Sequence, residues 1–210
     1  MTSAFISPPI PNPLPVPAKT PQLAVLASGK GSNMESIAAA IDQGKLQAEL
    51  KVIIYNNPDA GVAERAKQRN IPAVLLNHRE FPTREALDTE IIKTIKDYQA
   101  DWVIMAGWMR RVTQVLIDAF PQHILNIHPS LLPSFPGIKA VEQALAAGVK
   151  VAGCTVHYVE LQVDSGPIIM QAAVPIHTND TPASLQARIQ IQEHQIYPAA
   201  IAIAASSKNC

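Results

Sequence analysis

The chain has 210 residues, of which 48% are hydrophobic and 16% charged, so it can bury a core and is too apolar for an intrinsically disordered protein. Lys and Arg together number 17, as do Asp and Glu, and this zero net charge argues against nucleic acid or an anionic membrane as a main partner. All uninterrupted apolar stretches are shorter than the roughly 20 residues of a membrane span. Two cysteines, Cys154 and Cys210, cannot build a disulfide framework, which favours a cytoplasmic location and a core thiol at Cys154.

Prolines dominate the start of the chain, where they recur at positions 8, 9, 11, 13, 15, 17 and 21. Each proline lacks a backbone N–H donor and fixes φ, so this segment cannot form a helix. It also has neither the basic start nor the apolar run of a signal peptide. We therefore expect residues 1–20 to be a disordered arm outside the fold, either solvated or bound by a proline-recognising partner, and residues 21–210 to form the functional domain.

From Gln22 onward, short apolar runs alternate with segments of helical spacing, which is typical of repeated βα units. Strands are predicted at residues 22–27, 50–55, 72–76, 102–106, 123–127, 153–160 and 167–176. The run at 102–106 is apolar without alternation, as expected of a central parallel strand covered on both faces. Thr181 and Pro182 begin a final helix that continues past Tyr197. The sequence predicts a single α/β domain with a mostly parallel, Rossmann-like sheet and helices on both faces.

The loop after the first of these strands, residues 28–33, reads SGKGSN and has the composition of a phosphate site. Ser32 and Glu35 have the spacing of a capping box, which predicts a helix that begins on the glycines. Its free N–H groups would face a ligand above Gly31, Ser32 and Asn33. The spacing fits neither a Walker A loop nor a complete dinucleotide fingerprint. Taken alone, the loop fits either a phosphate monoester site or a tight turn without a ligand.

A second polar block, residues 126–133, reads NIHPSLLP and follows an apolar strand. Strand alternation sends Asn126 and His128 to the same face, and the prolines stiffen the loop that follows. An amide beside an imidazole can donate hydrogen bonds to an oxygen that becomes negative, as acyl transfer requires, although a histidine at a strand end also serves purely structural roles. The histidines and cysteines have no zinc-ligand spacing, so no metal is predicted.

A third motif, residues 164–167, reads DSGP and joins the two late strands. The carboxylate of Asp164 can stabilise a protonated imidazole nearby. The same residue also suits an ordinary turn, so the local sequence leaves both interpretations open.

In this order, the three motifs together resemble the phosphoribosylglycinamide formyltransferase family, the folate-dependent formyltransferases of purine synthesis. The resemblance extends over roughly residues 22–205, and the block at 126–133 is its most specific part. It implies the formyltransferase fold for the domain at 21–210. The implied reaction moves a formyl group from 10-formyltetrahydrofolate to the amine of glycinamide ribonucleotide, without a metal.

The resemblance also implies roles for particular residues. The catalytic group would be Asn126, His128 and Asp164. The ribonucleotide would be bound by Gly31, Ser32, Asn33, Gln190 and Glu193. The folate would lie against Met109, Arg110, Arg111, Val112, Asn126, Glu160, Leu161, Gln162, Val163 and Asp164, with Arg84 at its glutamate tail. In the implied mechanism, the amide and the protonated imidazole stabilise an oxyanion, while the carboxylate supports the imidazole and helps to move a proton through water.

Two departures from the family's usual residues bear on the folate site. Ser165 stands where a second glycine is common, and residues 160–162 also differ, which would shift the backbone of the folate loop. Trp108 replaces the more usual Phe and would either narrow the folate pocket or fill core.

Other functions use related features. A formyltetrahydrofolate hydrolase passes the formyl group to water with the same kind of catalytic group, but it carries an N-terminal regulatory domain and gives the phosphate loop no purpose. A methionyl-tRNA formyltransferase needs a basic appended domain, which the length and net charge argue against. A non-catalytic nucleotide-binding module would bind the ribonucleotide without turnover. The oligomeric state is left open.

Overall fold

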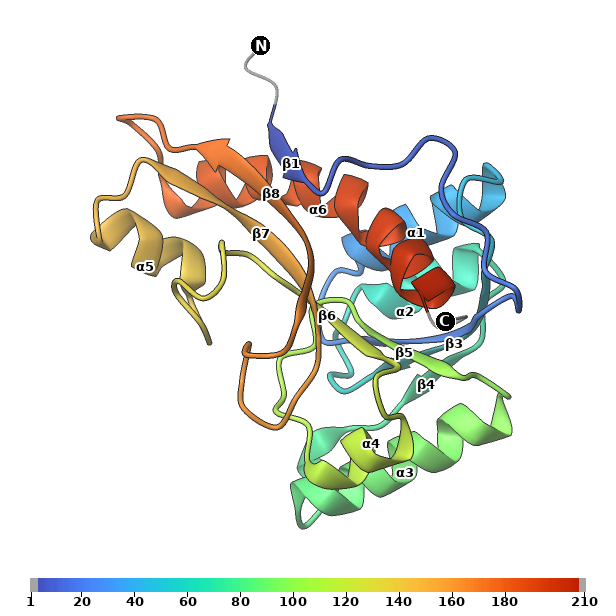
Figure 1. Ribbon diagram of the computed structural model, residues 1–210. Helices are drawn as coiled ribbons and strands as arrows, with labels where there is room; N and C mark the ends of the chain where they lie inside the picture. The colour runs from blue at the N-terminus through green and yellow to red at the C-terminus, as the bar shows by residue number, and fades with distance from the viewer. Residues whose placement is uncertain (1–3, 208–210) are drawn as a thin grey trace.

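An eight-stranded sheet organises the fold in the computed structural model, which describes residues 4–207 (Figure 1). The strand order is β1-β8-β7-β6-β5-β2-β3-β4. The parallel strands are β2 (Gln22–Ala27), β3 (Glu49–Tyr55), β4 (Ala73–Leu75), β5 (Trp102–Met105) and β6 (Ile124–His128). The sheet continues antiparallel through β7 (Val151–Tyr158), β8 (Ile168–Pro175) and β1 (Phe5–Ser7). The predicted mostly parallel sheet is confirmed, and the bounds of the predicted strands shift by at most two residues.

Helices cover both faces of the sheet, as predicted. One face carries α1 (Ser32–Asp42), α2 (Val62–Gln68), α5 (Ala140–Ala146) and α6 (Pro182–Ser206). The other carries α3 (Arg84–Asp97), which follows the short turn η1 (His78–Glu80), and α4 (Gln114–Ala119). The side chains of β2 alternate between the two faces of the sheet. Leu23 and Val25 pack in the hydrophobic cluster with α1 and α6, while Ala24 and Leu26 pack in the cluster with α3 and α4. Such a doubly covered strand explains the continuous apolar runs in the sequence.

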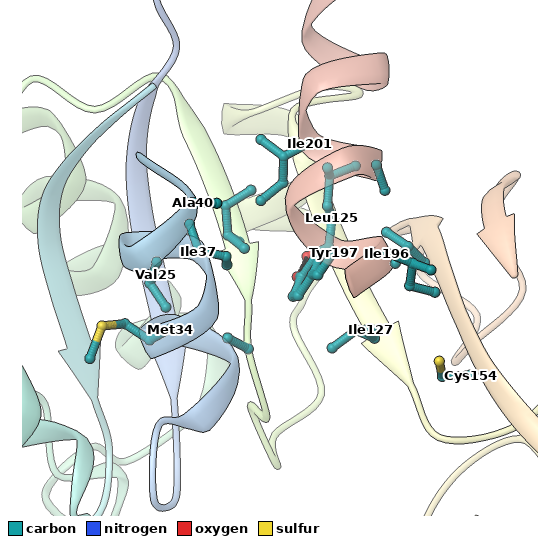
Figure 2. Close-up of a cluster of buried hydrophobic side chains, with 14 of the residues drawn as sticks. Val25, Met34, Ile37, Ala40, Leu125, Ile127, Cys154, Ile196, Tyr197 and Ile201 are labelled. Carbon is teal, nitrogen blue, oxygen red and sulfur yellow. Dashed lines mark hydrogen bonds between the residues drawn. The ribbon is translucent and has the colours of Figure 1, made fainter. Parts of the chain in front are cut away.

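The longest helix, α6, packs mainly against β7 and β8 and confirms the predicted helix that starts after Thr181 and passes Tyr197. Figure 2 shows Tyr197 of this helix between Leu125 and Ile127 of β6. The Tyr197 hydroxyl donates to the carbonyl of Met105 at 3.0 Å and lies 3.2 Å from that of Leu125, so it ties α6 to the adjacent strands β5 and β6. Within residues 4–207, no helix has both the length and the apolar character required to cross a membrane.

The Pro-rich arm differs from the prediction, because residues 4–20 lie on the fold and not outside it. Strand β1 pairs with β8 at the sheet edge, and Ile6, Ile10 and Leu14 pack against the core. Prolines exclude a helix, but they allow an extended segment at a sheet edge, where a missing N–H need not break a ladder. The part of the expectation that concerns residues 1–3 falls outside the described residues.

The packing of the arm predicts a measurable contribution to stability. Ile6→Asp should lower the free energy of unfolding by about 1–2 kcal/mol, because a carboxylate replaces an apolar side chain on the core. Lys19→Ala is the matched control in the same arm, since it removes a 2.7 Å ion pair to Asp101 whose lysine side chain is 80% exposed. Lys19→Ala should lower the free energy of unfolding by less than about 0.5 kcal/mol. Urea unfolding measures both, and a wild-type midpoint for Ile6→Asp would contradict a stabilising arm.

Candidate active site

A cavity of about 950 Å³ opens at the carboxyl ends of β2, β5 and β6. In open α/β sheets, ligands bind at this edge, where neighbouring strands connect in opposite directions. The cavity wall combines the loop at residues 29–33, the segment after β5, the end of β6, the loop after β7 and the inner face of α6. All three sequence motifs therefore contribute to one cavity.

The loop before α1 forms the polar end of the cavity. Gly31 precedes the helix with a left-handed φ of 77°, and a Cβ at this position would lie 2.6 Å from Cγ2 of Val62. Only glycine fits such a position without strain. The predicted helix is present, but the predicted capping box is wrong, because no side chain caps the first turn and Glu35 instead accepts from Arg69 Nε at 3.0 Å. The free start of α1 is a ready-made site for an anion.

Helix α6 brings two more of the predicted residues to this loop. Gln190 Nε2 donates to Ser32 Oγ at 2.8 Å, and Asn33 Nδ2 donates to Glu193 Oε2 at 2.8 Å. Glu193 is 4% exposed, and burial raises the pKa of its carboxyl although the bond from Asn33 lowers it in part. Asn33 Oδ1 is buried without a hydrogen-bond partner, which leaves one acceptor for a ligand. The structure thus joins residues about 160 positions apart in one polar patch.

The end of β6 and the loop after β7 place Asn126, His128 and Asp164 together. Asp164 Oδ2 lies 3.3 Å from Nδ1 of His128, and Asn126 Nδ2 lies 3.5 Å from Oδ1 of the same carboxylate. The second ring nitrogen of His128 donates to the carbonyl of Phe135 at 2.9 Å. Because both ring nitrogens face acceptors, the geometry suits a protonated imidazole.

Asp164 is held by several donors and is therefore suited to remain ionised. Its Oδ2 accepts from the N–H of Gly137 at 2.7 Å. Burial alone would raise the pKa of Asp164, but His157, the Gly137 N–H and the charge of His128 outweigh burial and lower it below its ordinary value. Near neutral pH this carboxylate can therefore stabilise positive charge on the neighbouring ring.

His157 is the residue of this cluster that the sequence did not identify. It is 2% exposed on β7, directly opposite Asn126 in the antiparallel register. Its Nδ1 lies 2.8 Å from the Tyr158 carbonyl oxygen, and its Nε2 lies 3.1 Å from Asn126 Nδ2 and 3.7 Å from Asp164 Oδ1. His157 therefore contacts both the amide and the carboxylate of the cluster. Nothing local in the sequence marks His157, because its role depends on the register between two strands.

Most of the residues expected to contact folate line the cavity. These are Met109, Arg110, Arg111, Val112, Asn126, Glu160, Leu161, Val163 and Asp164. Two do not line it: Arg84 is exposed at the start of α3, and Gln162 is exposed in the loop, where its carbonyl accepts from Ser165 Oγ at 2.9 Å. Trp108 is 6% exposed and belongs to the core of the α3 face, so it fills core as one of the two alternatives had it, and it also lines the cavity.

Side chains suited to metals are dispersed in the structure. Within residues 4–207, no group of three or more His, Cys, Asp or Glu is placed to hold a metal ion. Cys154, one of the labelled core residues in Figure 2, is fully buried, and burial raises the pKa of its thiol, as expected of an inert core cysteine.

Comparison with known proteins gives one consistent result. The formyl transferase family profile matches residues 21–201. The chain is 41% identical over 180 residues to phosphoribosylglycinamide formyltransferase of Bacillus subtilis (strain 168), covering 86% of this chain and 92% of that protein. It is also 41% identical over 187 residues to the trifunctional purine biosynthetic protein adenosine-3 of Drosophila pseudoobscura pseudoobscura, covering 88% of this chain but 14% of that protein. The crystal structure of glycinamide ribonucleotide transformylase 1 from Symbiobacterium toebii matches with a TM-score of 0.88 and 44% identity, covering 90% and 89% of the two chains.

Proposed function

Because the chain belongs to the formyl transferase family, we propose that residues 21–210 transfer a formyl group from 10-formyltetrahydrofolate to the amine of glycinamide ribonucleotide, in purine biosynthesis. The observation that carries this proposal is the position of Asn126, His128 and Asp164 between a phosphate-type loop and a largely apolar wall in one cavity. The phosphorylated amine needs the phosphate-type loop, and the folate that donates the formyl group needs the apolar wall. The reacting atoms of both substrates then meet at the three polar side chains.

The two ends of the cavity differ in the way the two substrates require. At the polar end, the free start of α1 and the unpartnered Asn33 Oδ1 suit a phosphate and a hydroxyl donor. Elsewhere in the lining, Met109, Ile138 and Leu161 are 69%, 72% and 61% exposed, so an apolar ring system can cover them. A volume of about 950 Å³ is at the upper end for small-molecule sites, as expected of two ligands bound together.

In the reaction, Asn126 and His128 stabilise the oxygen of the transferred formyl group. The substrate amine attacks the formyl carbon, a new C–N bond forms, and the bond from that carbon to the folate nitrogen breaks. Asn126 Nδ2 and the protonated ring of His128 donate to the oxygen as it becomes negative. His128 Nε2 exchanges its bond to the Phe135 carbonyl for this one, and Asn126 exchanges its long 3.5 Å contact with Asp164.

Asp164 faces the His128 ring and guides the proton. The carboxylate lies 3.3 Å from Nδ1, so it stabilises the imidazolium throughout the reaction. It also accepts a proton from the attacking amine through water, and that proton ends on the leaving folate nitrogen. Asp164 has a left-handed φ of 53°, which aims its carboxylate at the N–H of Gly137 and at the two histidines. Holding the substrates in line supplies much of the remaining acceleration.

A formyltetrahydrofolate hydrolase is not favoured. A hydrolase needs the catalytic group and the apolar wall, but it leaves the bonds from Gln190 to Ser32 and from Asn33 to Glu193 without a purpose. Mixing the protein with 10-formyltetrahydrofolate and recording folate absorbance separates the classes. Release of tetrahydrofolate only with glycinamide ribonucleotide present supports the transferase, and release without it identifies the hydrolase. Absence of release in both mixtures would identify a non-catalytic binding module.

Glu193 provides a test of the ribonucleotide end. Glu193→Gln should raise KM for the ribonucleotide about tenfold, because a neutral amide accepts more weakly from a ribose hydroxyl than a carboxylate does. Thermal stability should be unchanged or higher, since burial disfavours the charge that this substitution removes. Gln195→Ala, at an exposed position of the same helix, is the control and should change neither quantity. An unchanged KM in Glu193→Gln would remove this residue from the site.

Three expectations from the sequence stay predictions. A cytoplasmic location follows from the use of cysteine, and a free, buried Cys154 is compatible with it. A metal-independent reaction follows from the chemistry assigned to the amide and imidazole. Contacts of Arg84 and Gln162 with folate would require the bound ligand to extend beyond the cavity.

A further inference from the structure

The segment between β5 and α4, residues 106–113, forms much of the wall to which the proposed function assigns folate. It is an irregular connection in which Trp108 and Val112 pack into the core of the α3 face while Met109 is exposed. Gly107 turns the chain sharply after β5 with a left-handed φ of 81°. Besides this packing, side-chain hydrogen bonds hold the backbone of the segment near both ends, at Met109 and at Thr113.

Ser28 holds the first end. Its backbone N–H donates to the carbonyl of Gly107 at 3.0 Å, and its Oγ accepts from the N–H of Met109 at 2.9 Å. Ser28 lies directly after β2 and before the phosphate-type loop. The hydroxyl of Ser28 therefore ties the first end of residues 106–113 to the end of β2.

Asp88 holds the second end. This carboxylate is 2% exposed in α3, and its Oδ2 accepts from the N–H of Thr113 at 2.6 Å. Burial raises the pKa of Asp88, and the bonds from Thr113 lower it only in part. A buried carboxylate is costly unless it makes strong hydrogen bonds, and here the bond goes to the backbone at the end of the cavity wall.

We propose that Asp88 is a positioning residue which, together with Ser28, holds residues 106–113 in the geometry that receives folate. Neither side chain lines the cavity, so both act through the backbone of this segment. The role rests on the proposed function, because it concerns the folate end of that site. It predicts an effect on folate that is separate from any effect on the ribonucleotide, which binds at the other end.

The test measures binding of tetrahydrofolate and of glycinamide ribonucleotide separately, by calorimetry on the full chain. Asp88→Ala leaves the Thr113 N–H without an acceptor and should raise the Kd for tetrahydrofolate about tenfold. The Kd for the ribonucleotide should stay within about twofold, since its loop is anchored elsewhere. Asp88→Asn retains an oxygen acceptor and should restore folate binding. Asp97→Asn, exposed at the far end of the same helix, is the matched control and should leave both values unchanged.

Ser28→Ala tests the residue that holds the first end of the segment. It also provides the test of the proposal if Asp88→Ala does not fold. It removes the acceptor for Met109 and should weaken folate binding in the same selective way. Wild-type folate affinity in either alanine variant, or an equal loss for both ligands, would overturn the proposal. If the wild-type protein bound the ribonucleotide but no tetrahydrofolate, the proposed function would fail and the positioning role with it. Folate binding by the wild type that no anchor variant weakens would overturn the positioning role alone.

Discussion

His128→Ala should lose turnover by a factor of about a hundred or more while it retains wild-type affinity for glycinamide ribonucleotide. The ring is the charged donor to the oxygen that becomes negative, and an alanine leaves Asn126 as the remaining side-chain donor. Asp164 then also loses the positive partner 3.3 Å away. The ribonucleotide is bound at the start of α1 and by α6, so the substitution leaves its binding groups in place.

The measurement pairs single-turnover kinetics with ribonucleotide binding. His177→Ala is the control, because His177 is an exposed histidine away from the cavity and should behave like the wild type. Thermal unfolding of His128→Ala verifies that the domain remains folded, since the ring it removes is 5% exposed. Retained turnover in folded His128→Ala would remove the imidazole from the mechanism.

Gly31→Ala should raise KM for the ribonucleotide by about a hundredfold and lower the thermal stability. An added Cβ would lie 2.6 Å from Val62 Cγ2 and 3.0 Å from its Cα, so the loop or α2 has to move. The left-handed φ of 77° adds about 1–2 kcal/mol of backbone strain for any residue with a Cβ. Movement of a few tenths of an ångström is enough to spoil N–H donors aimed at a phosphate.

Gly29→Ala is the matched control for this prediction. It lies in the same loop, but a Cβ there has no neighbour within 4 Å. Its KM should therefore stay within about threefold of the wild type. Steady-state kinetics at varied ribonucleotide concentration measure both variants. Equal KM values for Gly31→Ala and Gly29→Ala would show that the loop does not bind the phosphate as proposed.

Local patterns predicted those parts of the fold and site that depend on neighbours in sequence. The apolar run at 102–106 indicated a central strand because both faces of that strand are covered. Alternation placed Asn126 and His128 on one face, and the structure has both on the cavity wall. The glycines and small polar residues of the first loop indicated a helix start open to an anion, which the free end of α1 provides.

The parts that the sequence did not predict depend on long-range pairing. The arm lies on the fold because β1 pairs with the edge strand β8. The prolines of the arm do not indicate that this edge is available for pairing. Glu35 does not form the predicted capping box because its carboxylate accepts a hydrogen bond from Arg69, which lies at the end of α2. His157 enters the site through its register opposite Asn126, a relation that no local pattern specifies.

The most direct test follows the formyl carbon itself. The protein is incubated with glycinamide ribonucleotide and 10-formyltetrahydrofolate labelled in the formyl carbon, and the products are separated and counted. We predict that the label appears in the ribonucleotide in amounts equal to the tetrahydrofolate released, and that His128→Ala slows both by a factor of about a hundred or more. Label recovered as free formate, at a rate that does not depend on the ribonucleotide, would contradict the proposed transfer.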